Sequence, residues 1–534
     1  MEPINQETKK IMEGCKDRAR EVGLVVPDDT LEFIVTNRDL INLMPKIMIP
    51  TLYDYWVQDI KVIRDAEKYK HFPENPYEAV INSRPAISFY NDNNPDWLNI
   101  MIFYHVLGHI DFFRNNIFFK QTEHDDFVGK ALTDKQLIEQ LRSEKGRWVD
   151  YVIEFSRGID NIVGFYDTLS EEFTCSNIKA PEKVRFYFDV FLQKLKKTSY
   201  DEYLRELGRY NSIIKDTPTI IGNRAEDIFF TDVDSKYPEF QTLFKKHKEE
   251  KRKPQDLLDY LLQKSPFLNR EENLWMKSVV RIVRDTSLYF QPQSRTKIMN
   301  EGWASYWHEK LFISDERIKG HLIDFSIINA YVTSPGRLGL NPYALGLRLF
   351  KHIQEMGDKG KDSYEFQLLN DINKRNNFDN KAGKGNELIF KVRENYSDQT
   401  FIAHYVDQDF MDRYQLFVAQ ENEFDPDRGT IPYTLKNRKA EDFKQMLFSK
   451  LPDSPIINVS EDKTDKTLYL VHDFKGKKLL KRHVPHVMRG IEFLWGAPVK
   501  LETVEVHKDD SGTVKYQKVL YTMENKEFTK EKLE

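Results

Sequence analysis

The run from Ile100 to Ile110 is among the most apolar in the chain, yet it contains two histidines, His105 and His109, four residues apart. An apolar run of this kind is expected to be buried, and a buried imidazole needs a partner. If the run is helical, positions i and i+4 lie on the same face, at the spacing by which two imidazoles bind one metal ion. The alternative is a pair of hydrogen-bonded core histidines. The spacing favours the metal ion.

The residues around this run predict a helix that follows a strand. Asn94 is suited to cap the helix, Pro95 to occupy its first position, and Asp96 to place a carboxylate at the positive end of the helix dipole. Residues 86–90 are rich in β-prone side chains and predict a strand leading into the helix. Gly108 has no side chain, so another backbone or a substrate could approach closely between the two histidines.

Composition limits the classes of protein that remain. The chain has 534 residues, 40% of them hydrophobic, with 36 Phe and 26 Tyr, which indicates a globular protein. The formal net charge of -5 gives no whole-molecule field that would attract nucleic acid, and we expect no nucleic-acid partner. The two cysteines exclude a disulfide framework.

Location follows from the same features. The acidic, polar start differs from a signal peptide, and no stretch approaches the length of uninterrupted apolar sequence that spans a membrane. We therefore expect a soluble cytoplasmic protein that is not integral to a membrane.

A second polar pattern lies on an aromatic helix predicted for residues 294–312, with Ser294 as its cap. Glu301, Ser305 and His308 fall at i, i+4 and i+7 and form one polar stripe among Trp and Tyr. If this stripe faces the histidine pair, two histidines and one carboxylate meet, which is the composition of catalytic zinc and of non-haem iron centres.

Only one end of this stripe can reach the same ion as the histidine pair. The step of seven positions from Glu301 to His308 corresponds to about 10.5 Å along a helix axis, too far for both to bind one ion. We predict His105, His109 and Glu301 as ligands of one divalent ion and His308 as the acid/base group. Zinc is expected, with iron and manganese left open.

Two short stretches resemble gluzincin aminopeptidases. Residues 300–306, Asn-Glu-Gly-Trp-Ala-Ser-Tyr, look like the motif that carries their glutamate zinc ligand, and residues 105–109 resemble their paired-histidine helix. Two departures matter. Val106 stands where those enzymes have the general-base glutamate, and nearly 200 residues separate the two stretches, which gluzincins place close together. A base must therefore come from elsewhere. The candidates are His308, Glu154, Glu123 and His124.

A closer resemblance covers most of the chain. Residues 104–116 and 299–308, with the later stretches 334–337 and 341–346, strongly resemble the SpoVR-like family, named after stage V sporulation protein R. The resemblance implies a bacterial cytoplasmic protein linked to formation of the spore cortex, which consists of peptidoglycan, or to stress responses in relatives that form no spores. It also implies a PrkA-type kinase and a YhbH-like protein as partners. It implies no particular reaction.

The remaining patterns predict a mainly α large domain with a metallopeptidase-like helical core and few strands, at residues 1–430, followed by a small α+β domain at residues 431–534. Helical spacing of apolar residues runs through 133–169 and again through 268–290, which we expect to end before Pro292. Period-two alternation near the C-terminus predicts strands at 456–459, 468–472, 499–506 and 514–521, a hairpin turn at 509–512 and a helix at 483–494.

Two functions from different classes follow. In the first, the protein is a metal-dependent hydrolase or transferase acting on an amide-like bond, with a peptide or peptidoglycan precursor as substrate and His308 or Glu154 moving protons. In the second, it is a non-catalytic scaffold or regulator in a kinase-linked sporulation or stress pathway, and the polar stripes tie two core helices together. Val106 favours the second function, and the number of polar groups in the site favours the first.

Overall fold

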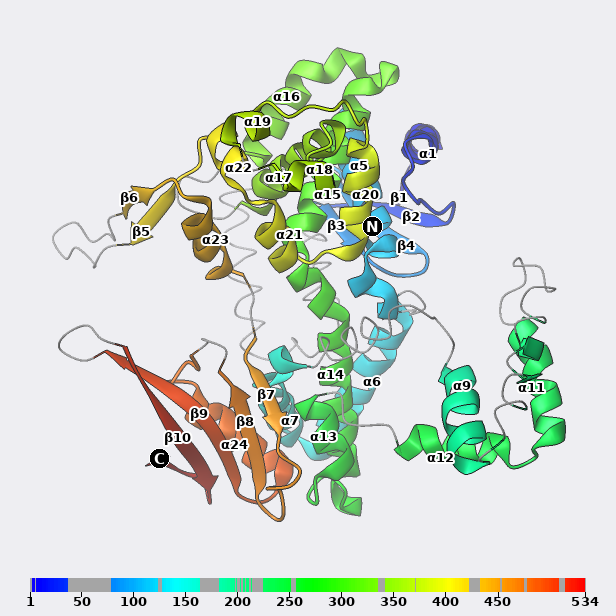
Figure 1. Ribbon diagram of the computed structural model, residues 1–534, viewed down its shortest axis with the longest axis vertical. Coiled ribbons are helices and arrows are strands. Elements are labelled where there is room, and N and C mark those ends of the chain that lie inside the picture. Colours follow the sequence, from blue (N-terminus) through cyan, green and yellow to red (C-terminus); the bar gives the residue numbers. More distant parts are fainter. Residues whose placement is uncertain are drawn as a thin grey trace. The chain divides into compact units, whose positions relative to one another are not determined.

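In the computed structural model the chain forms two compact units: residues 1–163 with 264–534, and residues 164–263. The structure describes residues 2–4, 6–36, 78–122, 127–163, 182–196, 224–250, 256–334, 341–369, 371–421, 433–451, 454–474, 478–508 and 514–533, with residues 198, 202, 205, 206, 208–210 and 213. Most elements are helices, and a sheet lies near the C-terminus (Figure 1), which confirms the predicted fold class.

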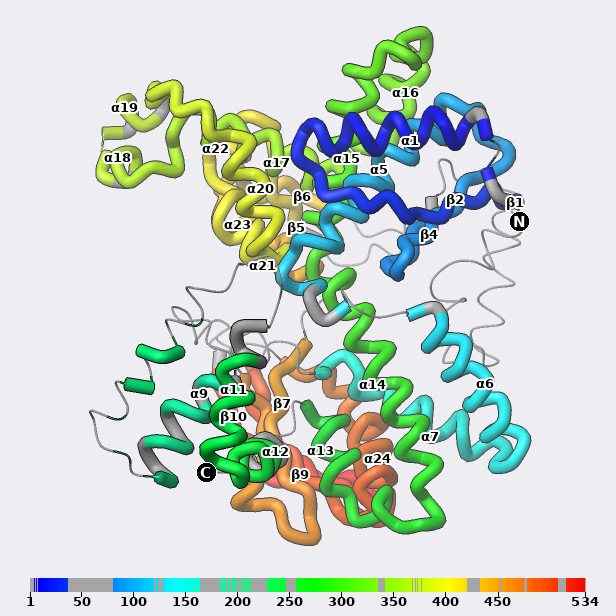
Figure 2. The backbone as a smooth tube through the Cα atoms, turned by 90° about the vertical axis from the view of Figure 1, so that its right-hand side faces the viewer, coloured from blue at the N-terminus to red at the C-terminus, as the bar shows by residue number. Residues whose placement is uncertain are grey.

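Three helices form the centre of the first unit. Helix α15 (Lys297–Ser314) packs against both α5 (Asp96–Asn115) and α17 (Pro342–Asp358). All side chains of α5 from Leu98 to Phe113 are buried, so this helix is enclosed by protein on every side. Figure 2 shows α5 and α15 side by side, with α1 (Gln6–Glu21) over them.

Glycine allows these helices to touch along their backbones. A Cβ atom on Gly108 of α5 would lie 2.7 Å from Ala304 Cα of α15. A Cβ atom on Gly302 of α15 would lie 2.4 Å from Gly346 Cα of α17. Real Cβ atoms do not approach so closely, so a side chain at these positions would push the helices apart. The prediction that another backbone approaches Gly108 is confirmed.

The start of α15 differs from the prediction. Helix α14 (Leu274–Arg295) continues through Pro292 and ends one turn later, next to Thr296 and the start of α15. The predicted helix end before Pro292 and the predicted Ser294 cap are therefore wrong. A proline near a helix end removes only one backbone hydrogen bond, and the burial of Tyr289, Pro292 and Arg295 keeps the last turn in place.

Helix α15 is capped from a distant part of the chain. The carboxylate of Asp398, at the start of α21 (Asp398–Tyr405), accepts hydrogen bonds from the backbone N–H groups of Ile298 and Met299, both at 2.9 Å. The predicted Asn94 cap of α5 is also wrong. Pro95 precedes the first helical residue and no side chain caps it, while the Asn94 amide donates to Asn99 instead.

A four-stranded sheet lies before α5, with strand order β1-β2-β4-β3. Strands β2 (Thr30–Val35) and β4 (Ala86–Asn91) pair in parallel, and the pairs at both edges, with β1 (Glu2–Pro3) and β3 (Glu78–Ile81), are antiparallel. Strand β4 confirms the strand predicted before the histidine helix, and it packs against α5.

The C-terminal sheet has the order β11-β10-β9-β8-β7. Four of its strands confirm the predicted ones: β7 (Ile456–Val459), β8 (Leu468–Asp473), β9 (Val499–Lys508) and β10 (Val514–Glu524). The fifth, β11 (Glu527–Lys532), was not predicted, because its mostly exposed, charged sequence is that of an edge strand. The predicted turn at 509–512 and the domain boundary at 430/431 lie outside the described residues.

The predicted C-terminal helix is confirmed as α24 (Val484–Trp495), which lies on this sheet and also packs against α7 (Trp148–Arg157). Trp148 of α7 stacks on Phe493 of α24 with ring centroids 6.1 Å apart. A Cβ atom on Gly490 would lie 3.1 Å from the Phe155 ring. Helix α24 therefore lies between the C-terminal sheet and α7, and it contacts both.

The other described elements of the first unit are short or peripheral. They are η1 (Ile117–Thr122), α6 (Phe127–Lys145), η2 (Asp160–Ile162), η4 (Glu271–Asn273), η5 (Glu316–His321), α16 (Leu322–Val332), α18 (Tyr364–Gln367), α19 (Ile372–Asn376), α20 (Gly385–Asn395), α22 (Gln408–Arg413), β5 (Val418–Glu421), β6 (Tyr433–Asn437) and α23 (Ala440–Phe448). Among the described residues, no helix combines the length and the apolar character that crossing a bilayer requires.

The second unit has its own aromatic core. Its described helices are α9 (Glu182–Arg185), η3 (Phe186–Leu195), α11 (Arg224–Lys236), α12 (Phe240–Glu250) and α13 (Leu257–Lys264), whose last residue belongs to the first unit. The buried cluster consists of Val184, Phe186, Tyr187, Phe188, Phe191, Leu192, Phe229, Phe230, Val233 and Phe240. The sequence analysis did not predict residues 164–263 as a separate unit.

The end of α15 is tied to α5 and α1 through one carboxylate. Asp315 accepts hydrogen bonds from the Tyr104 hydroxyl at 2.8 Å and from two guanidinium nitrogens of Arg317 at 2.9 and 2.6 Å. Arg317 also donates to the carbonyl of Ile11 in α1 at 3.1 Å. Burial alone would raise the pKa of Asp315, but the hydrogen bonds from Arg317 and Tyr104 outweigh it and lower this pKa to about 2.

We predict that Gly108→Ala destabilises the fold by about 1–3 kcal/mol, because the added methyl group overpacks the crossing of α5 and α15. Alanine is the better helix former, so propensity alone would give the opposite sign. The measurement is the free energy of unfolding in urea. Gly320→Ala is the control, because a Cβ atom there meets nothing within 4 Å. Equal stabilities of the two variants would contradict the close crossing.

We also predict that Asp315→Asn destabilises the protein in a pH-dependent way. The pKa of Asp315 is below that of an unfolded aspartate, so its contribution, on the order of 2 kcal/mol, is present above pH of about 4 and is lost as the pH falls toward 2. The difference in unfolding free energy between wild type and Asp315→Asn should therefore shrink on acidification. A difference that stays constant between about pH 6 and pH 3 would rule out this linkage.

Candidate metal centre

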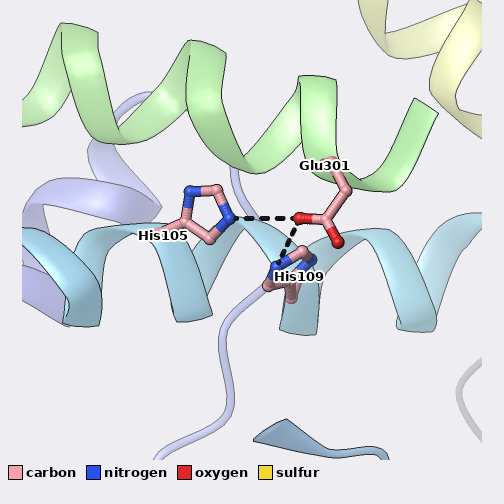
Figure 3. Close-up of side chains that lie close together, drawn as sticks. All are labelled: His105, His109 and Glu301. Carbon is pink, nitrogen blue, oxygen red and sulfur yellow. Dashed lines mark ion pairs between the residues drawn. The ribbon is translucent and has the colours of Figure 1, made fainter. Parts of the chain in front are cut away.

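His105, His109 and Glu301 converge at the crossing of α5 and α15. Glu301 Oε2 lies 3.5 Å from His105 Nε2 and 3.6 Å from His109 Nε2. Figure 3 shows both imidazole rings, from α5, directed at the one carboxylate from α15. Among the described residues, this is the group of His, Cys, Asp or Glu side chains whose ligand atoms gather closely enough to hold a metal ion.

The spacing of the three atoms fits a small divalent ion. Ligands about 2.0–2.1 Å from a tetrahedral ion are about 3.4 Å apart, close to the observed nitrogen–oxygen distances. A hydrogen bond from an imidazole N–H to a carboxylate is shorter, about 2.7–2.9 Å. The donor set of two imidazole nitrogens and one carboxylate suits zinc, and iron and manganese accept it too.

His109 is held by the residue next to the third ligand. Its Nδ1 atom lies 2.8 Å from Asn300 Oδ1 on α15. An amide oxygen accepts hydrogen bonds, so Nδ1 carries the proton and Nε2 presents its lone pair toward Glu301. Metal-bound histidines are commonly anchored through their other nitrogen in this way.

His105 is held through another histidine. His105 Nδ1 lies 2.7 Å from His308 Nδ1, and His308 Nε2 lies 2.9 Å from Asn329 Oδ1 on α16. His105, His109 and His308 are all buried. The ring of Tyr343, at the start of α17, stacks on His105 with centroids 5.9 Å apart.

The electrostatics of the site favour a bound cation. Glu301 Oε2 is buried and accepts no hydrogen bond from the described residues. A carboxylate oxygen left in this state costs free energy unless a positive charge lies beside it. Burial also raises the pKa of the neighbouring Asp398 to about 7, against its backbone hydrogen bonds, and the charge of Glu301 acts in the same direction.

The other predicted residues lie in different places. His308 contacts the side of His105 that faces away from Glu301, so it touches a ligand rather than the space between the ligands. Glu154 is exposed on α7, a helix whose main packing partners are α14, α24 and α6. Glu123 and His124 lie outside the described residues. Val106 is fully buried and brings no carboxylate to the site.

Two asparagines, Asn300 and Asn329, contact the histidines and were not among the predicted site residues. Asn300 could have been found from the sequence, because it directly precedes Glu301 in the motif and lies on the helix face that meets α5. Asn329 could not have been found in this way, because it lies on a helix whose apolar residues follow no amphipathic pattern. Ser305 was noted as part of the stripe. Its hydroxyl group is buried and has no hydrogen-bond partner among the described residues.

Comparisons with known proteins place this site in a family. The family model described as "SpoVR like protein" matches residues 4–454, which include the histidine pair, Glu301, His308 and Asn329. The chain is also 25% identical to the uncharacterized protein YcgB of Escherichia coli (strain K12), over 496 residues that cover 88% of this chain and 86% of that relative. No solved structure matches the chain. The chain therefore belongs to the SpoVR-like family.

Proposed function

We propose that the protein is a metal-dependent hydrolase or transferase that acts on an amide-like bond through a divalent ion held by His105, His109 and Glu301. The observation that carries the proposal is the convergence of two imidazole nitrogens on one carboxylate oxygen, at 3.5 and 3.6 Å, in a buried place. A divalent ion supplies Lewis-acid polarisation of a carbonyl group, which cleavage of an amide-like bond requires.

Three protein ligands support a catalytic rather than a purely structural ion. Structural zinc sites are closed by four protein ligands, and catalytic sites keep one position open for substrate or water. The side chain of Glu301 is 16% exposed, against 4% and 5% for the two histidines, so access is from the glutamate side. The ring of Tyr343 stacks on His105, and we propose Tyr343 as a substrate contact.

The proton-transfer group remains a prediction. We propose that Glu154 is not within reach of the metal position and that His308 keeps His105 in place, so the base comes from another residue or from the substrate. The substrate class, a peptide or peptidoglycan precursor, is proposed from the family link to the spore cortex. From the same family link we propose a PrkA-type kinase and a YhbH-like protein as partners.

A non-catalytic function is the second candidate. Fully buried Val106, at the position of the gluzincin base, favours it, because an aliphatic side chain transfers no proton. In this case the ion, or the polar contacts alone, would join α5 to α15 in a scaffold or regulator of a kinase-linked pathway. The two candidate functions involve the same residues, but only the first predicts that the protein converts a substrate.

We predict that the purified protein binds one divalent ion per chain and that His105→Ala and Glu301→Gln each weaken binding by more than about 100-fold, the upper end of what losing a supporting contact costs. Metal content is measured by elemental analysis and affinity by competition with a chelator. The matched controls are His404→Ala and Glu461→Gln, which change exposed residues outside the site. Wild-type protein without a stoichiometric ion, and unable to bind one, would refute the metal centre.

We further predict that wild-type protein cleaves amide bonds in a panel of peptides and peptidoglycan stem peptides, that a chelator abolishes the cleavage, and that added Zn²⁺ restores it. The measurement is the release of primary amine over time. Glu301→Gln should be inactive while keeping its fold, because it removes the anionic ligand without changing the size of the side chain. Metal-loaded protein that cleaves no member of the panel would favour the non-catalytic candidate.

A further inference from the structure

We propose that Glu309, Asn329 and His308 form a hydrogen-bonded chain that decides which ring nitrogen of His105 carries the proton, and thereby keeps His105 Nε2 open for the ion. This inference deepens the proposed function and rests on the same metal centre. In it, Glu309, Asn329 and His308 are positioning residues, because they act on the ion only through His105.

The contacts run from the surface to His105 and involve four helices. Lys351 Nζ of α17 lies 2.5 Å from Glu309 Oε1 on α15. Asn329 Nδ2 on α16 donates to Glu309 Oε2 at 3.2 Å. Asn329 Oδ1 lies 2.9 Å from His308 Nε2, and His308 Nδ1 lies 2.7 Å from His105 Nδ1. Each contact is within hydrogen-bonding distance.

Glu309, at the start of the chain, determines which atom donates and which accepts in every hydrogen bond that follows. The carboxylate of Glu309, paired with Lys351, offers acceptor oxygens only, so it must face the amide NH₂ group of Asn329. The amide oxygen then faces His308 and takes a hydrogen bond from Nε2. Neutral His308 is left with an acceptor at Nδ1, so His105 must donate from its own Nδ1. His105 Nε2 therefore has a lone pair, which is what a metal ligand needs.

Reversing the amide of Asn329 would reverse the whole chain. An NH₂ group facing His308 would require an acceptor at His308 Nε2 and a donor at His308 Nδ1. His105 would then accept at Nδ1 and carry its proton on Nε2, directed at Glu301. That tautomer forms a hydrogen bond to the carboxylate and binds no ion. Through Asn329 and His308, the carboxylate of Glu309 therefore selects the tautomer of His105 that can bind a metal ion.

Aromatic packing holds Asn329 in place. Phe325 is the one buried residue of α16. Its ring stacks on Phe312 of α15 with centroids 4.5 Å apart, and its edge meets the His308 ring at 6.0 Å. Asn329 lies one turn after Phe325 and so faces the same helix.

The first test measures affinity for Co²⁺, whose visible spectrum also reports ligand geometry. Asn329→Leu should lower the affinity by about 10–100-fold and change the Co²⁺ spectrum, although all three ligands remain. Ser326→Ala, which changes an exposed residue on the same helix, should match wild type. Glu309→Ala is the second variant if Asn329→Leu folds poorly.

A double change tests the direction of the bonds. Glu309→Gln combined with Asn329→Asp should restore binding, because the amide introduced at position 309 donates to the carboxylate introduced at position 329. That carboxylate still accepts from His308 Nε2, so the proton of His105 stays on Nδ1. A double variant that binds Co²⁺ as weakly as Asn329→Leu would contradict the proposed direction.

The second test needs no metal. In ¹⁵N-histidine-labelled, metal-free protein at about pH 8, above the ordinary imidazole pKa, NMR distinguishes the two neutral tautomers. His105, assigned by comparison with His105→Gln, should carry its proton on Nδ1 in wild type. In Asn329→Leu a substantial fraction should move to Nε2, and the double change should reverse the shift.

The outcomes separate this inference from the proposed function. Wild-type protein that binds no ion, but whose His105 tautomer responds to Asn329→Leu, would refute the metal centre and support the chain. Wild-type protein that binds Co²⁺ with an affinity unaffected by Asn329→Leu and Glu309→Ala would overturn the chain and leave the metal centre intact. A proton on His105 Nε2 in wild type would overturn the chain whatever the metal result.

Discussion

The contact between Gly108 and Ala304 is the constraint on which the site depends. The two histidines flank Gly108 on α5, and Glu301 lies just before Ala304 on α15, so the separation of the two backbones sets the separation of the three ligand atoms. A Cβ atom on Gly108 would lie 2.7 Å from Ala304 Cα, so the two backbones are in contact at this crossing. Helix α15 is fixed in turn by its contact with Gly346 of α17 and by the Asp398 cap. Helix packing alone therefore brings the three candidate ligand atoms together.

The sequence predicted the parts of the site that follow from local pattern. His105 and His109 share a face at i and i+4, and Glu301 stands out as a carboxylate on an aromatic helix, so both stripes could be found without a structure. Asn329 could not be found, because its role depends on how α16 folds back over His308. The strands with clean period-two alternation were predicted. Strand β11 was missed, although it pairs with the adjacent strand β10, because its mostly charged residues show no apolar alternation. The last turn of α14 was missed because it depends on the burial of Pro292 and Arg295.

Polar contacts other than the ligands already join α5 to α15. Asp111 accepts a hydrogen bond from the Trp303 indole at 2.8 Å and lies near Arg393, and burial raises its pKa to about 6 despite these partners. His109 contacts Asn300 and His105 contacts His308. These hydrogen bonds would be enough to hold α5 and α15 together. The Nε2 atoms of the two histidines lie 3.5 and 3.6 Å from Glu301 Oε2, which is longer than a hydrogen bond from an imidazole N–H to a carboxylate. At these distances the three atoms add repulsion and desolvation unless a cation lies between them. This excess is the physical argument for a metal centre over a polar core.

The same geometry limits the chemistry that the centre can perform. His105 Nδ1 and His109 Nδ1 are both engaged in holding the rings, so neither histidine is free to transfer protons. Val106 is enclosed and aliphatic, and His308 faces the outer side of His105. A proton acceptor for the proposed hydrolysis would therefore enter from the side where Glu301 is 16% exposed.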